Sequence, residues 1–377
     1  MKTIDKLLDV GKTNKPRDYS LDAIKGIACI CMILAHAQIQ EGKAAAALSF
    51  LIGGLAPTLF FAVSGVTTTF QITRTKIIPI AISYLLLSVL GFSYNAMWRP
   101  NLWTTVACDI FQIIAIGVIA VSYLEQYIKP KKIYYLFLSV GIFSIHHFVT
   151  HKFQLPPFPF RQFLFAGEWA GFTFPIFPWL GAFFAGVFAY NCKKSINLVL
   201  AFIYAIGLVI TFAINKNISL LPDKVNVSLE YYFLSYSFLF LSFYLFRKFA
   251  KNWSNNLIVY IGKNSLLFLY VHVILLRLVF PPLGFNRAIP VWIASLILSV
   301  VMIYLLERGN IYLEKYFQNF YTWGIIAILT CGIPLVFQDE TAIKYNAAVI
   351  GLLFAANYHS LSKLIKQKFS QTVNFVG

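Results

Sequence analysis

Acidic residues are scarce in this chain, which has 14 Asp and Glu against 31 Lys and Arg in 377 residues. Charged residues of both signs make up only 12% of the sequence, and hydrophobic residues make up 59%. Soluble domains carry about twice that share of charge, so the composition excludes an ordinary water-soluble domain. It predicts a polytopic integral membrane protein.

Cysteines are also few and odd in number, and no two have a spacing typical of a metal site. They lie in or beside apolar runs, where we expect small buried side chains rather than a disulfide framework. The sequence has no heptad repeat, no low-complexity tract and no segment long enough to fold as a separate soluble domain.

The chain contains twelve apolar segments, and they predict an all-α fold with about 11–12 transmembrane helices in one bundle. The segment 322–337 is short for a membrane core of about 30 Å. The last segment is interrupted by Asn346 and Asn357. The segments are 20–39, 45–66, 77–96, 104–124, 133–149, 173–190, 196–214, 229–246, 259–277, 289–306, 322–337 and 344–360.

The formal net charge of +17 would suggest a nucleic-acid partner in a soluble protein. In this chain most of the basic residues fall on one side of the predicted membrane, the side that also holds both termini. The positive-inside rule therefore predicts cytoplasmic termini and no nucleic-acid partner. Because the chain is compact and has no added lumenal domain, we expect a bacterial inner membrane protein.

The first apolar segment carries three ionisable groups, Asp22, Lys25 and His36. Such groups are costly in lipid and usually mark function. Lys25 lies near the inner boundary, and His36 lies about 16 Å further out along the helix. Lys25, Arg74 and Lys76 could form an inner cationic pocket for a phosphorylated donor, with Arg74 and Lys76 merely enforcing topology as the alternative.

The predicted outer half of the bundle holds His36 and Asp109, and His272 lies near the midplane. A carboxylate beside a histidine holds the imidazole in one tautomer and makes it a usable base. The alternative is that Asp109 bonds a helix terminus and His36 is a satisfied interior residue. His272 is a candidate substrate contact or proton relay, or a structural histidine. The cluster of His146, His147 and His151 lacks a Cys or acidic partner, and we expect no metal.

Several stretches together resemble the transmembrane acyltransferase superfamily, which includes the acyltransferase 3 family and the heparan-alpha-glucosaminide N-acetyltransferase catalytic family. The stretches are Arg17 with Ser20-Leu21-Asp22-Ala23-Ile24-Lys25-Gly26-Ile27-Ala28 and His36, Ala56-Pro57-Thr58-Leu59-Phe60-Phe61-Ala62-Val63-Ser64-Gly65, Arg74-Thr75-Lys76, Asp109-Ile110-Phe111-Gln112, Phe174-Pro175-Ile176-Phe177-Pro178-Trp179-Leu180-Gly181 with Gly186, and Gly262 to His272. Many relatives have Arg where this chain has Lys25, and Lys cannot reproduce the bidentate contact of Arg.

The resemblance implies a division of the chain into a cytoplasmic leader (1–19), an acyltransferase-like transmembrane domain (20–280), additional C-terminal transmembrane helices (281–361) and a cytoplasmic tail (362–377). It also implies transfer of an acyl group, commonly acetyl from cytosolic acetyl-CoA, to a carbohydrate hydroxyl or amine on the far side of the membrane. The expected partners are acyl-CoA, a glycan or lipid-linked sugar and membrane lipids, and a homodimer is compatible with the sequence.

The resemblance further implies roles for individual residues. Lys25, Arg74 and Lys76 would bind the CoA phosphates. His36 would deprotonate the acceptor or be acylated itself, Asp109 would orient it, and His272 would contact substrate or leaving group. Supporting residues would be Asp22, Tyr270 and Trp179. The competing hypotheses are a transporter or flippase for a sugar or lipid-linked metabolite, although no inverted repeat is visible, and an inactive relative that serves in assembly or sensing.

Overall fold

A computed structural model describes residues 17–37, 47, 51–98, 108–152, 164–165, 174–214, 227–285, 288–337 and 339–373. Within these ranges all regular structure is helical, with no strand. Ten of the described helices are long and apolar enough to cross a membrane, and two shorter apolar helices, Ile176–Asn191 and Phe320–Gly332, accompany them. The predicted all-α integral membrane fold is confirmed, and each of the twelve predicted segments coincides with one of these helices.

The helices that matter for the site come from both ends of the chain. Their bounds are α1 Tyr19–Ala37, α3 Ala56–Ile72, α4 Ile77–Leu90, α5 Phe92–Trp98, α7 Ile110–Tyr123, α10 Ile176–Asn191, α13 Leu257–Lys263, α14 Ser265–Ile274, α15 Ile289–Leu313 and α17 Glu340–Val373. The remaining long helices are α8 Lys132–Lys152, α11 Lys194–Ile214, α12 Leu229–Phe249 and α16 Phe320–Val336.

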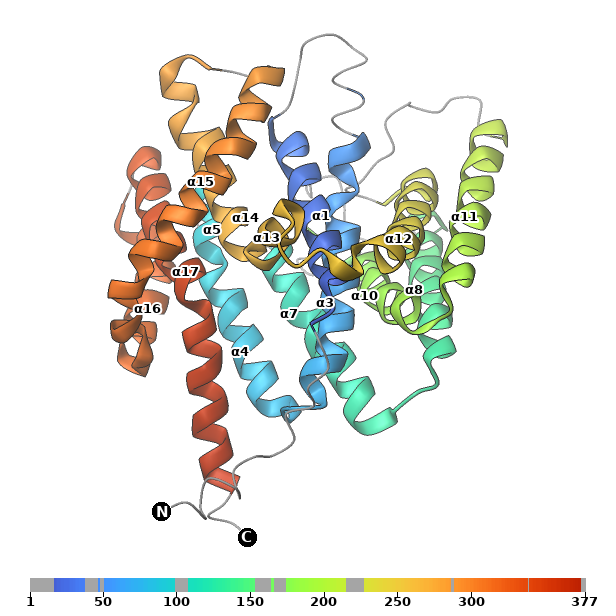
Figure 1. Cartoon of the computed structure of the whole chain (residues 1–377), viewed down its shortest axis with the longest axis horizontal. Coiled ribbons are helices and arrows are strands. Elements are labelled where there is room, and N and C mark those ends of the chain that lie inside the picture. Colours follow the sequence, from blue (N-terminus) through green and yellow to red (C-terminus); the bar gives the residue numbers. More distant parts are fainter. Residues whose placement is uncertain are drawn as a thin grey trace.

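Helices α1, α3 and α7 occupy the middle of the bundle (Figure 1). On one side α10 packs on α3 and α8, and α11 packs on α12. On the other side α17 packs on α4, α5, α14 and α16. The peripheral helices, such as α11 and α15, expose rows of large apolar side chains, as expected of surfaces that face lipid.

Close backbone contact joins α1 to α13. A Cβ added to Gly262 would overlap the carbonyl oxygen of Asp22, and one added to Gly26 would overlap the carbonyl oxygen of Ile258. Small residues are what allow two helices to approach to this distance. The crossing fixes the start of α14 beside α1, and this brings residues more than 200 positions apart in the sequence into one site.

The ninth apolar segment differs from its prediction as one helix over 259–277. Asn264 has φ −101° and ψ 22°, which ends α13 and places Asn264 at the N-cap of α14. A turn of π-helix, Leu275–Val279, then follows α14. Asn favours caps over helix interiors because its side chain competes for backbone hydrogen bonds, and π-turns within helices are frequent at functional sites.

The fourth segment also differs, because α7 begins at Ile110 and not at residue 104. The side chain of Asp109 accepts hydrogen bonds from the backbone N–H groups of Ile110 (2.6 Å) and Gln112, and the side chain of Gln112 accepts one from the Asp109 N–H (3.0 Å). This reciprocal arrangement is a capping box, which defines a helix start.

The last segment is one uninterrupted helix despite its two asparagines. The side-chain amide of Asn346 donates to the carbonyl of Ala342 (2.8 Å), and that of Asn357 donates to the carbonyl of Leu353 (3.0 Å). The side-chain NH₂ group of each asparagine is thereby satisfied inside the helix. Helix α17 continues through Val373, into the stretch predicted as a tail.

Candidate active site

Two histidines predicted separately meet across the bundle. His36 from α1 and His272 from α14 place their Nδ1 and Nε2 atoms, respectively, 2.9 Å apart. The ring planes are nearly parallel, inclined by 10°, with centroids 5.1 Å apart. His272 is fully buried, and its Nδ1 lies 2.8 Å from the carbonyl oxygen of Phe268, one helical turn earlier.

An aromatic side chain contacts His36, and a cationic side chain contacts that aromatic ring in turn. Trp98, the last residue of α5, contacts the His36 ring edge-on at a centroid distance of 4.6 Å. The guanidinium carbon of Arg277 lies 4.2 Å from the centroid of the Trp98 ring, a cation–π contact. A proton-accepting pair therefore lies close to a fixed positive charge, an arrangement suited to reactions that develop negative charge on oxygen.

Sequence reasoning missed both Trp98 and Arg277. Arg277 is the last residue of the predicted ninth segment and follows His272 by five residues in the same apolar run. A charged side chain inside an apolar run is energetically unfavourable in lipid. The argument that singles out Lys25 and His36 therefore applies to Arg277 as well.

Asp109 lies at the start of α7, where its carboxylate caps the helix. Asp109 and Arg277 both lie within electrostatic range of the Tyr94 side chain. The ring of Tyr94 contacts that of Trp98 at 6.4 Å, so Asp109 borders the same aromatic wall. The capping role, which the sequence left open as the alternative, is confirmed. Direct orientation of His36 by Asp109 stays a prediction.

The two aromatic residues predicted as supports lie in packed surroundings. Tyr270 is fully buried, and its hydroxyl lies 2.9 Å from that of Ser93 at the start of α5. It thereby ties α14 to the helix that carries Trp98. Trp179 packs edge-on against Phe61 and Tyr231. These contacts suit structural support, and a substrate role for either residue stays a prediction.

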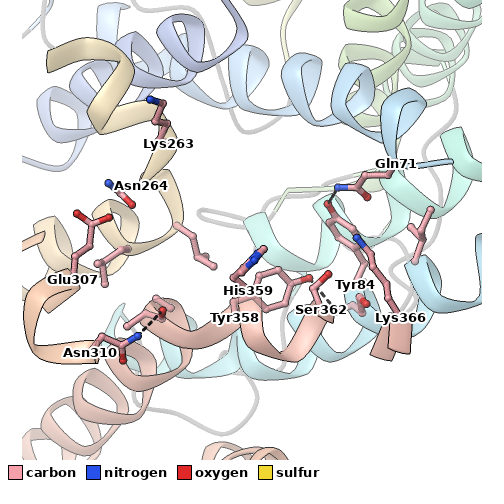
Figure 2. A pocket seen from close by; sticks show the side chains of 16 residues that line it. Gln71, Tyr84, Lys263, Asn264, Glu307, Asn310, Tyr358, His359, Ser362 and Lys366 are labelled. Carbon is pink, nitrogen blue, oxygen red and sulfur yellow. Dashed lines mark hydrogen bonds between the residues drawn. The ribbon is translucent and has the colours of Figure 1, made fainter. Parts of the chain in front are cut away.

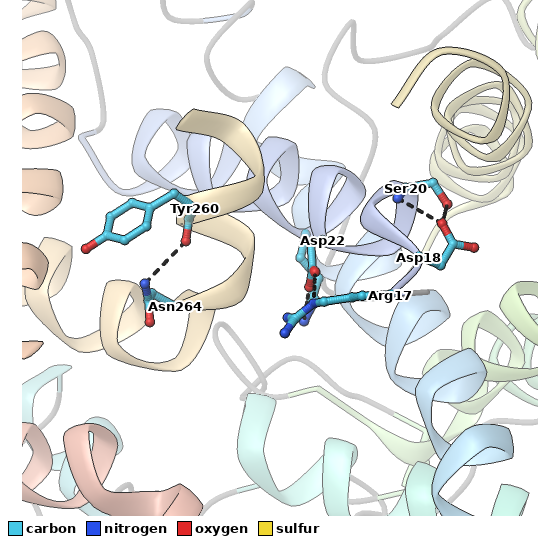
Figure 3. Close-up of polar contacts among 7 residues, drawn as sticks. Arg17, Asp18, Ser20, Asp22, Tyr260 and Asn264 are labelled. Carbon is cyan, nitrogen blue, oxygen red and sulfur yellow. Dashed lines mark hydrogen bonds and ion pairs between the residues drawn. The ribbon is translucent and has the colours of Figure 1, made fainter. Parts of the chain in front are cut away.

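Asp22 joins two cations at the start of α1 (Figure 3). Its carboxylate accepts a hydrogen bond from Arg17 Nε at 2.7 Å and lies 3.4 Å from Lys25 Nζ. The hydrogen bond to Asp22 raises the pKa of Arg17 above its ordinary value. The partner that Lys25 requires inside an apolar segment is therefore Asp22, a carboxylate with only 6% of its side chain exposed.

We expect Asp22→Asn to lower the free energy of unfolding by about 1–3 kcal/mol, because two cations lose a nearly buried carboxylate. Thermal unfolding of the detergent-purified protein measures the change. The exposed pair of Glu340 with Lys344, also 3.4 Å apart, supplies the control: Glu340→Gln should cost less than about 0.5 kcal/mol. Equal losses in the two variants would contradict a structural role for Asp22.

A pocket of about 570 Å³ opens between α14, α15 and α17 (Figure 2). Lys263, from the end of α13, and Lys366, from α17, lie at different ends of it, with His359 between them. Polar side chains line much of the remainder, namely Gln71, Ser83, Tyr84, Asn264, Glu307, Asn310, Tyr358 and Ser362. Both the size and the mixture of charge with apolar wall suit a phosphorylated ligand of moderate size.

The three cationic residues predicted to bind the donor are not described as lining this pocket. Its described lining contains none of Lys25, Arg74 and Lys76. Lys25 is paired with Asp22, Lys76 precedes the first residue of α4, and Arg74 is within electrostatic range of Lys366. Lys263, Lys366 and His359 were not singled out as donor ligands, since Lys366 and His359 lie beyond every motif that the sequence offered.

One helix connects the pocket to the histidine pair. Asn264, Leu266 and Leu267 at the start of α14 line the pocket, and His272 lies further along the same helix. Eight residues separate Asn264 from His272, a rise of about 12 Å. A ligand held by its charged end in the pocket therefore needs an extended arm of about that length to reach His36 and His272.

No group of three His, Cys, Asp or Glu side chains in the described part of the chain is placed to hold a metal ion. The arrangement offers acid–base groups and fixed charge instead. Comparison with known proteins agrees with this chemistry, because a family model described as an acyltransferase domain matches residues 18–308. A search of curated proteins found no match.

Proposed function

The chain belongs to the acyltransferase 3 family and is a membrane acyltransferase, and from the site we propose the donor, the acceptor and the direction of transfer. The donor is a cytosolic acyl-CoA, most simply acetyl-CoA, and the acceptor is a carbohydrate hydroxyl or amine on the extracytoplasmic side. The observation that carries the proposal is the connection of a charged pocket to the pair of His36 and His272 by the single helix α14.

In the proposed reaction His36 takes the proton of the acceptor as its oxygen or nitrogen attacks the thioester carbonyl. The carbon–sulfur bond then breaks, and the departing thiolate receives a proton from the histidine, so that free CoA and the acylated acceptor leave. Transient acylation of His36 is the two-step version of the same transfer. Arg277, held beside Trp98, supplies positive charge near the developing oxyanion.

The phosphates of the donor would bind Lys263 and Lys366, with Arg74 close to the latter. Lys and Arg side chains favour phosphate through charge-assisted hydrogen bonds. Lys25 and Lys76 would add positive charge along the path by which the donor phosphates approach the pocket. The pantetheine arm would run along α14. The rise of about 12 Å from Asn264 to His272 can be spanned by an extended thioester arm but not by a compact metabolite.

In the proposed orientation the pocket lies on the cytoplasmic side, with both termini, in a bacterial inner membrane. The excess of basic residues in the loops on that side supports the orientation. A donor made in the cytosol and an acceptor outside then approach His36 from opposite directions.

Binding of acetyl-CoA to detergent-purified protein tests the donor site. We expect Lys263→Ala and Lys366→Ala each to raise the Kd by about 10-fold, since one charge-assisted contact is lost in each. Lys363→Ala is the matched control, because Lys363 is exposed on the same helix as Lys366 and does not line the pocket. Its Kd should stay within about 2-fold of the wild type.

Donor turnover separates the proposed enzyme from a transporter. Wild-type protein incubated with acetyl-labelled acetyl-CoA should release CoA in a reaction that depends on an added carbohydrate acceptor, or should label itself. Absence of binding at millimolar acetyl-CoA in folded protein would contradict the proposal and favour the transporter.

A further inference from the structure

We infer that His272 is a positioning residue that fixes His36 as its Nδ1–H tautomer, so that the Nε2 atom of His36 is the one that accepts the proton. The inference rests on the proposed function for its catalytic meaning. Its structural content, the location of two protons, can be tested without any reaction.

The first step concerns the bond between His272 and its own helix. The carbonyl oxygen of Phe268 can only accept a hydrogen bond, and it lies 2.8 Å from Nδ1 of His272. The Nδ1 atom of His272 must therefore carry a proton. In a neutral imidazole only one nitrogen is protonated, which leaves Nε2 of His272 as an acceptor.

The second step follows at the contact between the two rings. Nε2 of His272 lies 2.9 Å from Nδ1 of His36. Since Nε2 is the acceptor, Nδ1 of His36 is the donor, and the lone pair of a neutral His36 is then at Nε2. The opposite direction would require a second proton, and hence a charge, on a fully buried His272, which is unfavourable in an apolar interior.

Packing holds this arrangement in place. The ring of Phe268 stacks on that of His272 at 5.7 Å, and Trp98 contacts His36 edge-on. Rotation of the His272 ring would break two hydrogen bonds, and rotation of the His36 ring would break its bond to His272 and displace its contact with Trp98. His272 thus does for His36 what a carboxylate does in a catalytic triad: it fixes the tautomer and accepts a hydrogen bond from the imidazolium that forms.

The proton balance of the transfer follows from the tautomer. The acceptor gives its proton to Nε2 of His36 as its oxygen or nitrogen bonds to the acyl carbon. The resulting imidazolium keeps its Nδ1–H bond to His272. The same Nε2–H then protonates the sulfur when the carbon–sulfur bond breaks, so no further co-reactant is needed.

Nitrogen NMR of protein labelled with ¹⁵N at its six histidines tests the tautomer directly. The resonances of His36 are identified by their loss in His36→Asn. We expect the wild-type spectrum to show protonated Nδ1 and unprotonated Nε2 for both His36 and His272. A wild-type His36 protonated at Nε2 and not at Nδ1 would overturn the inference, whatever the activity.

Two variants extend the test to the reaction. His272→Phe keeps an aromatic ring but no acceptor, and it should let His36 shift toward the Nε2–H tautomer and lower kcat by about 10- to 100-fold with an unchanged KM for acetyl-CoA. His272→Gln can offer an amide oxygen near the former Nε2 and should recover part of the loss in kcat. A His272→Phe protein with wild-type kcat and tautomer would overturn the positioning role.

The experiments also separate this inference from the proposed function. If the wild type shows the expected tautomers but transfers no acyl group from acetyl-CoA, the donor assignment fails while the arrangement of protons stands. If transfer occurs with His36 protonated at Nε2, the function stands and the positioning role fails.

Discussion

His36→Asn is expected to fold like the wild type and to transfer acyl groups at least about 100-fold more slowly, the usual contribution of a general base. The amide nitrogen of Asn lies close to the position of imidazole Nδ1, so the variant can keep the hydrogen bond to His272 Nε2 that the structure contains. It has no atom in place of Nε2. The substitution therefore removes the proposed base and preserves the contact between α1 and α14.

The initial rate of acetyl transfer from labelled acetyl-CoA measures this loss. Acetyl-CoA binding and thermal unfolding of the same preparation are the controls, and both should remain at wild-type values because the pocket lining does not include His36. A folded, donor-binding variant that retained more than a tenth of the wild-type rate would exclude His36 as the base.

Gly262→Ala is expected to have the largest effect on stability, a loss of more than about 3 kcal/mol or failure to fold. The added methyl group would overlap the backbone carbonyl of Asp22. Backbone atoms in a helix cannot move aside as a flexible side chain does. The helices α1 and α13 must then separate, which would also disturb Lys263 and the Asp22 ion pairs.

Gly309→Ala is the matched control, because it places the same methyl group in α15 with nothing within 4 Å. Replacing a glycine inside a helix should there stabilise the protein by about 0.5–1 kcal/mol. Thermal unfolding in one detergent compares the two variants, and the melting temperature of Gly262→Ala should fall by on the order of 10 °C. A melting temperature of Gly262→Ala equal to that of Gly309→Ala would contradict the tight crossing.

The membrane fold could be predicted because long apolar runs are a local property of the sequence. The interruptions were harder to judge. Asn346 and Asn357 lie within a continuous helix, where each bonds a carbonyl four residues earlier, whereas Asn264 ends a helix. The residue type is the same in all three places. What differs is the surrounding fold, in which the crossing at Gly262 precedes the break.

The candidate site could be predicted in its components but not in its connections. His36 and His272 stood out because ionisable residues in apolar segments are unfavourable without a role. Their direct contact spans 236 positions of sequence, and no local pattern encodes it. Asp109 was expected beside His36 because carboxylates commonly orient histidines, and that role stays a prediction, whereas the contact of His36 with a second histidine was not expected.

The pocket lining was the least predictable part. Lys263 lies inside the stretch from Gly262 to His272 but was not expected to bind the donor, and Lys366 belongs to a helix that carries no recognised motif. Both become significant only when α13 and α17 line one cavity, with the two lysines at different ends of it (Figure 2). Such convergence depends on tertiary packing, which hydropathy and motif spacing do not describe.

The wall that α17 contributes has a consequence for how this protein can diversify. The matched domain ends at residue 308, yet Tyr358, His359, Ser362 and Lys366 line the pocket from beyond it. The histidine pair lies entirely within the domain. Replacement of α17 would therefore exchange six of the sixteen residues that line the pocket while leaving the acid–base groups intact, so that ligand preference and chemistry can evolve in separate parts of the gene.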